Sequence, residues 1–99
     1  MSSIGFRTAA FDVDGTLIHL TGEREDTPRY DVIQFFHFLQ NNGYCMYVWS
    51  GGGVDYAERW VQKLGLNAIV VPKGHFKPDI AVDDEDVKLG EFNLRVPLP

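Results

Sequence analysis

Two aspartates separated by one residue, Asp12 and Asp14, follow the apolar run at residues 6–11 and are closed by Gly15 and Thr16. Two carboxylates this close repel each other when both are ionised, and a cation bound between them removes that repulsion. Oxygen ligands favour Mg²⁺ over zinc, and Mg²⁺ commonly binds together with the phosphate groups of a substrate. The pair therefore predicts a Mg²⁺ site that serves a phosphate-bearing molecule.

A second acidic pair, Asp83 and Asp84, follows another apolar run at residues 79–82. In an open α/β sheet, ligands bind beyond the carboxyl ends of the strands, next to the point where the strand order reverses. If both apolar runs are parallel strands, the two acidic pairs lie at the same rim. We therefore expect all four carboxylates to contribute to one cation site.

The segment Ser50-Gly51-Gly52-Gly53 lies between the apolar run at 44–49 and a predicted helix. A hydroxyl group and free backbone amides at a helix N-terminus are suited to hold a phosphate. A phosphate close to several carboxylates also needs a positive charge, and Lys73 and Lys77 are the candidates.

Four short, mostly apolar runs bounded by turn residues are typical of strands buried on both faces of a parallel sheet. These runs cover residues 6–11, 44–49, 68–71 and 79–82. A further run, FNLRV near the C-terminus, is interpreted as an edge strand.

Two helices are expected between these strands. In the first, Thr27 can cap the N-terminus, Pro28 suits the first turn and Gly43 suits the end. The second is predicted at Val54–Leu64, with Gly65 as its C-terminal cap. Strands that alternate with helices in this way indicate an α/β fold.

Composition limits the classes of protein to consider. The 99 residues are enough for one domain, taken as residues 1–99, and the formal charge of −5 argues against a protein that coats nucleic acid. The single cysteine, Cys45, has no partner for a disulfide. No apolar stretch approaches about twenty residues and the N-terminus lacks a leader pattern, so we expect a cytoplasmic protein without a membrane segment.

Four features occur in the order of the motifs of one superfamily: DVDGT at 12–16, Ser50 after a strand, a lysine, and two aspartates after a last strand. The chain thereby resembles a small member of the haloacid dehalogenase-like (HAD) phosphatases. The resemblance implies a compact, Rossmann-like, three-layer α/β fold with a short, mainly parallel central sheet and no cap domain.

The resemblance also implies a role for each acidic residue. Asp12 would be the nucleophile that accepts the phosphoryl group, and Asp14 would protonate the leaving oxygen and then activate water. Mg²⁺ would be held by the Asp12 side chain, the Asp14 backbone carbonyl and Asp83 or Asp84. The carboxylate at position 14 favours phosphomonoester chemistry, because the dehalogenases of the superfamily lack an acid there and its transport ATPases carry threonine.

By the same resemblance, Ser50, Gly51 and a lysine would bind the phosphoryl oxygens. Lys77 is preferred, because a Lys-Pro pair just ahead of the last acidic strand resembles compact members such as the capsule-biosynthesis-type phosphatases. Geometry favours Lys73 instead: if residues 77–83 are extended they span roughly 20 Å, which is too far for the Lys77 amine to return to the rim.

The function predicted on this basis is Mg²⁺-dependent hydrolysis of a small phosphomonoester such as a nucleotide or a sugar phosphate, with a nucleic-acid end less favoured. An alternative is a catalytically degenerate HAD-like module that binds metal or phosphate. It is supported by the segment at 72–78, which is too short for the helix that the family usually has there. Receiver domains share similar residues but carry them in the opposite order.

The first predicted helix is apolar over more than half of its circumference, which is wider than the stripe that one face of a sheet covers. Its apolar residues are Val32, Ile33, Phe35, Phe36, Phe38 and Leu39. Two interpretations stay open: the helix also packs against the C-terminal segment, or it forms the contact of a homo-oligomer.

Overall fold

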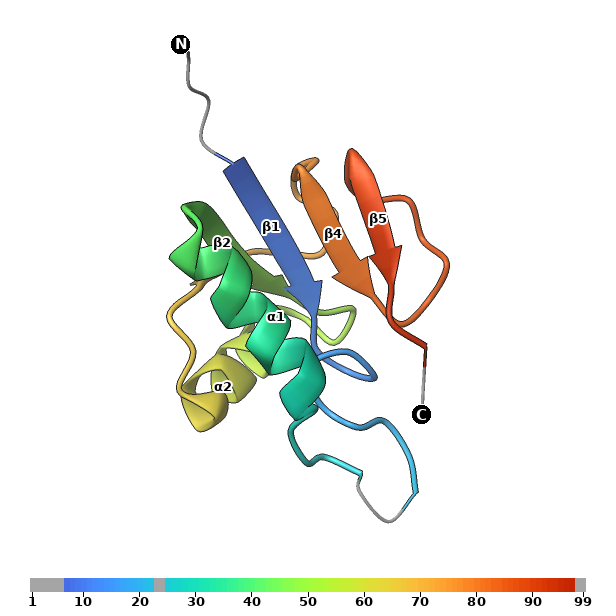
Figure 1. Cartoon of the computed structure of the whole chain (residues 1–99). Coiled ribbons are helices and arrows are strands. Elements are labelled where there is room, and N and C mark those ends of the chain that lie inside the picture. The colour runs from blue at the N-terminus through green and yellow to red at the C-terminus, as the bar shows by residue number, and fades with distance from the viewer. Residues whose placement is uncertain (1–6, 23–24, 98–99) are drawn as a thin grey trace, which may run out of the picture.

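The computed structural model describes residues 7–22 and 25–97, which form five strands and two helices (Figure 1). In chain order these are β1 (Arg7–Asp12), α1 (Tyr30–Asn41), β2 (Tyr44–Trp49), α2 (Val54–Leu64), β3 (Ile69–Val70), β4 (Ile80–Asp83) and β5 (Phe92–Arg95). The predicted alternation of strands and helices is confirmed. Most strand ends differ by one residue from the ends predicted from the sequence.

All five strands are parallel and form one sheet in the order β3-β2-β1-β4-β5. The central strand is β1, where Ala9 is opposite Met46 on β2 and opposite Ile80 on β4. Because the strands run in the same direction, their carboxyl ends meet at one edge of the sheet. The strand order reverses between β1 and β4, so the expected binding position lies at this junction.

The two helices have 12 and 11 residues, and no helix in the described ranges is long and apolar enough to cross a bilayer. The bounds of α2 are those predicted from the sequence, and Gly65 ends it in the left-handed conformation. The start of α1 was predicted too early, because Arg29 and not Thr27 occupies its N-cap. The Arg29 guanidinium reaches away and donates to the Gly15 carbonyl over 2.9 Å.

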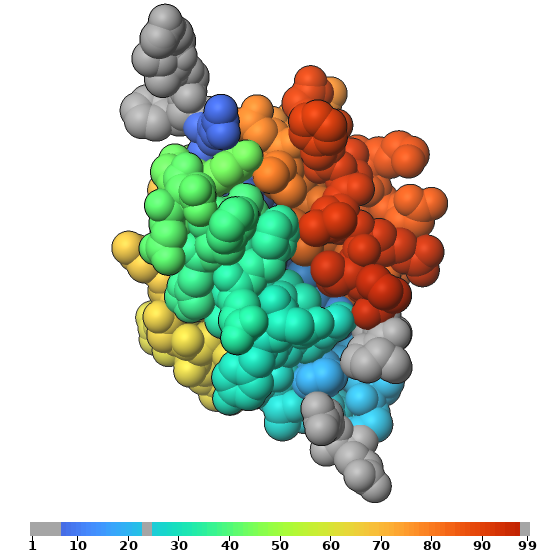
Figure 2. Space-filling view, viewed as in Figure 1, coloured from blue at the N-terminus to red at the C-terminus, as the bar shows by residue number. Residues whose placement is uncertain are grey.

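Both helices pack on the same face of the sheet, where they share the main core with alternate residues of β1 and β2. The fully or nearly fully buried residues of this core include Phe11, Phe36, Met46, Val48, Val61 and Val82. In Figure 1, α1 lies in front of the sheet and runs along β1 and β2. The half of that face formed by β4 and β5 has no helix in the described part of the chain, and Figure 2 shows the atoms of this region uncovered beside α1.

The opposite face of the sheet is covered by coil, so the predicted third layer of helices is wrong. Its small buried cluster contains Trp49, and the ring centroid of Phe76 lies 4.7 Å from that of Tyr47 and 6.0 Å from that of Trp49. The physical reason is length. Residues 71–79 must cross two intervening strands, a lateral distance of roughly 14 Å, and must also return from the carboxyl end of β3 to the amino end of β4. A parallel crossover that contains a helix needs about a dozen residues or more, so this segment is too short for one.

Candidate active site

The acidic residues predicted from the sequence meet at the carboxyl edge of the sheet. Asp12 is the last residue of β1, Asp83 is the last residue of β4, and Asp84 follows directly. Ser50 follows the end of β2 in the same way. The pairing of β1 with β2 and β4 fixes these positions, so the site is built on the central strand and its two neighbours.

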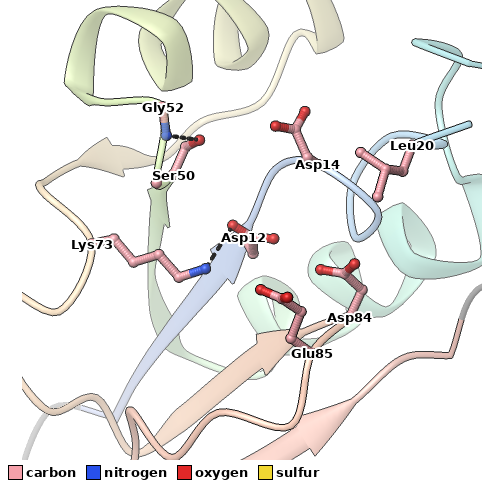
Figure 3. Close-up of a pocket in the computed structure, with 9 residues that line it drawn as sticks. Asp12, Asp14, Leu20, Ser50, Gly52, Lys73, Asp84 and Glu85 are labelled. Atoms are coloured by element: carbon pink, nitrogen blue, oxygen red, sulfur yellow. Dashed lines mark hydrogen bonds and ion pairs between the residues drawn. The ribbon is translucent and has the colours of Figure 1, made fainter.

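A pocket of about 270 Å³ lies at this edge (Figure 3). The residues that line it are Asp12, Asp14, Leu20, Ser50, Gly51, Gly52, Lys73, Asp84 and Glu85. Carboxylates therefore dominate the lining. Lys73 is the one lysine or arginine among these residues, and its side chain points from the coil after β3 toward Asp12.

Lys73 forms an ion pair with two buried carboxylates. Its Nζ lies 3.1 Å from Asp12 Oδ1 and 2.8 Å from Asp83 Oδ2. Burial alone would lower the pKa of Lys73, but the close contact with Asp83 and the charge of Asp12 outweigh it and raise the pKa. The ammonium group is therefore cationic and fixed between the ends of β1 and β4.

Lys77, the lysine preferred from the sequence, does not reach the pocket, so that prediction is wrong. Its ammonium pairs with Glu91 at 3.0 Å, and its side chain is 67% exposed. Lys77 precedes β4, whereas Asp83 ends it, so the two residues lie at opposite ends of the strand. The distance spanned by an extended 77–83 segment therefore excluded Lys77 correctly, and Lys73 is the lysine in the pocket.

Asp12 is held in an environment that disfavours its ionised form. Burial, followed by the charge of Asp83, raises the pKa of Asp12 from its ordinary value of 3.8 to about 7, although Lys73 acts in the opposite direction. Burial and a hydrogen bond with Asp83 also raise the pKa of Asp84. The positive charge of Lys73 is therefore not enough to compensate the negative charges of these neighbouring carboxylates.

Three of these carboxylates could hold a metal ion. One oxygen each from Asp12, Asp83 and Asp84 lies within 4.8 Å of the others. Asp83 Oδ2 is buried and, among the described residues, has no hydrogen-bond donor in good geometry, although Lys73 is close. At Gly15 a side chain would collide with the Asp84 carboxylate. A set of hard oxygen donors fits Mg²⁺ or a similar divalent cation.

The Asp14 side chain is directed to a different partner. Its Oδ1 accepts a hydrogen bond from the Tyr56 hydroxyl over 2.5 Å, and Tyr56 lies in the first turn of α2. Burial and this hydrogen bond raise the pKa of Tyr56 to about 12, so the phenol stays protonated and donates. The Asp14 carboxylate is not part of the three-carboxylate cluster, and metal binding by its backbone carbonyl stays a prediction.

The loop after β2 is a tight turn that leads into α2. The Ser50 hydroxyl accepts a hydrogen bond from the Gly52 amide over 2.9 Å, and Gly53 adopts a φ of 104° as the N-cap of the helix. A side chain at Gly52 would lie 3.1 Å from the Tyr56 ring. The glycines thus let the loop and Tyr56 approach each other, while phosphate binding by Ser50 and Gly51 stays a prediction.

Sequence reasoning missed Tyr56, Glu85 and Leu20 as residues of the site or its surroundings. For Tyr56 a signal was present, because side chains of a first helical turn point back toward the helix N-terminus, and here that end adjoins the loop at Ser50. Glu85 extends the acidic pair by one residue. Leu20 lies in a polar segment without periodicity, and no pattern in the sequence indicates it.

No protein-family model, curated protein or solved structure matches this chain. The assignment of a function therefore depends on the geometry of the pocket and on the order of its residues along the chain.

Without metal, the stability of the protein should fall as the pH rises from about 5 to about 8. A folded-state pKa of about 7 for Asp12, above the ordinary 3.8, stabilises the fold at low pH, and that contribution is lost as Asp12 ionises. In Asp12→Asn this contribution is absent. Relative to the parent protein, the variant should therefore gain stability as the pH rises, measured by thermal unfolding in EDTA.

Asp86→Asn is the matched control, because it also removes one carboxylate but its side chain is 78% exposed. Its difference from the parent should be the same at both pH values. An equal difference for Asp12→Asn at pH 5 and pH 8 would contradict the environment described for Asp12.

Proposed function

We propose that this chain is a Mg²⁺-dependent phosphomonoester hydrolase that forms an aspartyl phosphate on Asp12. The observation that supports this most is the convergence of Asp12, Lys73, Asp83 and Asp84 on one pocket, with Asp14 beside it. The same residues follow one another along the chain in the order of the HAD motifs. The parallel sheet places the nucleophile candidate at the point where such folds bind ligands.

In the proposed first step, an Asp12 carboxylate oxygen attacks the phosphorus atom. The bond from phosphorus to the substrate's ester oxygen breaks, and Asp14, acting as a general acid, gives that oxygen a proton. The products are an alcohol and a phosphorylated Asp12. Tyr56 occupies Asp14 Oδ1, so proton transfer is expected through Oδ2.

In the second step, Asp14 is ionised and acts as a general base. It takes a proton from a water molecule, the water oxygen bonds to phosphorus, and the bond to Asp12 breaks. Inorganic phosphate leaves, and both aspartates return to their starting states. One residue can serve both steps because the proton it gives to the alcohol is replaced by the one it takes from water.

Asp12, Asp83 and Asp84 would hold the divalent cation in this proposal. When bound, the cation would stabilise the negative charge on the transferring phosphoryl group. Lys73 would contribute a fixed positive charge at the Asp12 oxygen, and Ser50 with the amide of Gly51 would orient the phosphoryl oxygens. The pocket size favours a small phosphomonoester such as a nucleotide or a sugar phosphate.

The runner-up function, a metal- or phosphate-binding module without turnover, is supported by a specific contact. Lys73 already pairs with both Asp12 and Asp83, so the site is partly neutralised with no ligand. A binding module needs no general acid, however, and Asp14 with its Tyr56 contact has no evident use there. Turnover separates the two functions.

The proposal is tested by assaying a panel of phosphorylated metabolites and p-nitrophenyl phosphate, with Mg²⁺ and then with EDTA. Turnover should need the metal, and Asp12→Asn should lower it by at least about 10³-fold. Asp14→Asn should lose about 10²–10⁴-fold with alkyl phosphates. With p-nitrophenyl phosphate, whose leaving group needs little protonation, it should accumulate phosphorylated protein, seen by mass spectrometry after an acid quench.

Turnover by Asp12→Asn at the parent rate would exclude the aspartyl-phosphate mechanism. If no substrate turns over, and calorimetry nevertheless shows Mg²⁺ or phosphate binding, the binding module is the better description.

The two candidate lysines give a prediction with an internal control, because Lys73→Ala and Lys77→Ala each remove one positive charge. Lys73→Ala should lower kcat/KM by roughly 10²-fold, since it removes the cation that contacts Asp12 at 3.1 Å. Lys77→Ala should stay within about twofold of the parent, because its partner Glu91 is a surface residue. A larger loss at position 77 would contradict the site as described.

Tyr56 is expected to position Asp14 and not to react itself. Tyr56→Phe should slow the phosphorylation step roughly tenfold with an alkyl phosphate, which corresponds to about 1.4 kcal/mol. With p-nitrophenyl phosphate the same step should be nearly unchanged, because it does not depend on the general acid. Rapid acid quench in single-turnover conditions measures both rates.

Tyr44→Phe is the control, since Tyr44 starts β2 at the opposite end of the sheet. Equal losses with both substrates in Tyr56→Phe would indicate a general structural effect and overturn the positioning role.

A further inference from the structure

The free edge of β5 carries a sequence that is complementary to itself when two copies run antiparallel. It reads Glu91-Phe92-Asn93-Leu94-Arg95. A two-fold axis at Asn93 places Glu91 opposite the second copy's Arg95, and Phe92 opposite the second copy's Leu94. We propose that this chain forms a homodimer in which two β5 strands pair in this register and join both sheets into one.

On the outer side of β5, the backbone pairs with no strand among the residues that the structure describes. The amides of Phe92 and Val96 donate to the carbonyls of Asp79 and Asp83 over 2.9 and 2.8 Å, so these residues face β4. The Glu91 amide also turns inward, to the Pro78 carbonyl at 2.9 Å, and so is not available to a second copy. By the alternation of a strand, the amide and carbonyl of Asn93 face away from the sheet. Two Asn93 residues related by the axis can therefore donate to each other's carbonyls, as in a hydrogen-bonded antiparallel pair.

The side chains of β5 leave apolar surface in solvent. Phe92 is 74% exposed and Leu94 is 44% exposed. Both lie on the face of the sheet that carries α1 and α2, in the half over β4 and β5 where the described residues form no helix. In the proposed register each Phe92 covers the second copy's Leu94. Edge strands that stay unpaired are commonly very short or are protected by charged side chains, by proline or by a bulge. β5 is short, with four residues, but it contains no proline and no lysine.

The charges favour one register over its neighbours. If the axis moves to Phe92 or to Leu94, Arg95 comes opposite Leu89 or Asn93 and finds no carboxylate. The present contacts of the two charged residues are weak competitors. Glu91 pairs with the exposed Lys77 at 3.0 Å, and Arg95 Nε donates to the Asp84 carbonyl over 3.2 Å at the surface.

None of residues 91–95 lines the pocket described above, so the dimer goes beyond the proposed function and does not depend on it. An alternative contact between two copies would use α1, where Phe38 is 60% exposed. The charge complementarity lies on β5, and it favours the strand pairing.

Sedimentation equilibrium of the full chain at concentrations up to about 1 mM tests the proposal, because so small an interface should be weak. The parent protein should dimerise reversibly. Leu94→Lys should abolish the dimer, since a lysine in this position blocks strand pairing. Phe38→Lys is the matched control and should dimerise like the parent. Circular dichroism confirms that each variant is folded, and Phe92→Lys replaces Leu94→Lys if that variant is not.

A charge exchange tests the register itself. Glu91→Arg and Arg95→Glu each place like charges opposite one another twice per dimer, and each should raise the dimer Kd roughly tenfold. The double variant restores opposite charges across the axis and should return the Kd to the parent value. This rescue is specific to the antiparallel register about Asn93.

A parent protein that is monomeric at about 1 mM would overturn the proposal. So would a dimer that Leu94→Lys leaves intact, a dimer lost in Phe38→Lys but kept in Leu94→Lys, or a double charge variant as weak as the single ones.

Discussion

The contact of one ammonium group with two buried carboxylates is the interaction on which the site depends. Asp12 and Asp83 end neighbouring strands, and the register of β1 and β4 brings their side chains together whatever their charge. Buried like charges cost several kcal/mol unless they are compensated. Lys73 lies between them at 3.1 and 2.8 Å and supplies that compensation. The strand pairing thus brings two carboxylates that repel each other together, and Lys73, which lies outside the sheet, reduces that repulsion.

The coil that carries Lys73 is held in place by apolar contacts on the face without helices. The Phe76 ring packs on Tyr47 and Trp49, and a turn at Pro72, closed by the His75 amide, presents Lys73 toward the rim. Because the coil covers this part of the core, its path over the sheet and the position of the ammonium group are linked. The coil between β3 and β4 therefore covers this face of the sheet and also supplies the cation of the site.

Periodicity and turn residues were enough to predict the strands, the bounds of α2 and the shared rim of Asp12 and Asp83, because strands in a parallel sheet have little freedom. The same reasoning failed where the chain is irregular. Lys73 and Lys77 both lie in coil, and only the length of the following segment separated them. The predicted three-layer fold was wrong because it was taken from the resemblance to a family, although the short segment at 72–78 already indicated that the helix between β3 and β4 is missing. Tyr56 was missed although its place in the first turn of α2 directs its side chain toward the loop at Ser50, because its contact with Asp14 also depends on where α2 lies in space.

The charge balance of the pocket limits which ligands it can bind. Five carboxylates line it or adjoin it, from Asp12, Asp14, Asp83, Asp84 and Glu85, and Lys73 is the one cationic side chain among the lining residues. Its charge is already shared by two of the carboxylates, so little of it remains for an anion. A phosphate dianion would therefore be repelled from this pocket unless a further cation entered with it. The oxygen cluster of Asp12, Asp83 and Asp84 is placed where such a cation would relieve the repulsion between the carboxylates and attract the phosphate at the same time. For this pocket, binding of a phosphate ester and binding of a divalent cation are therefore expected to be coupled.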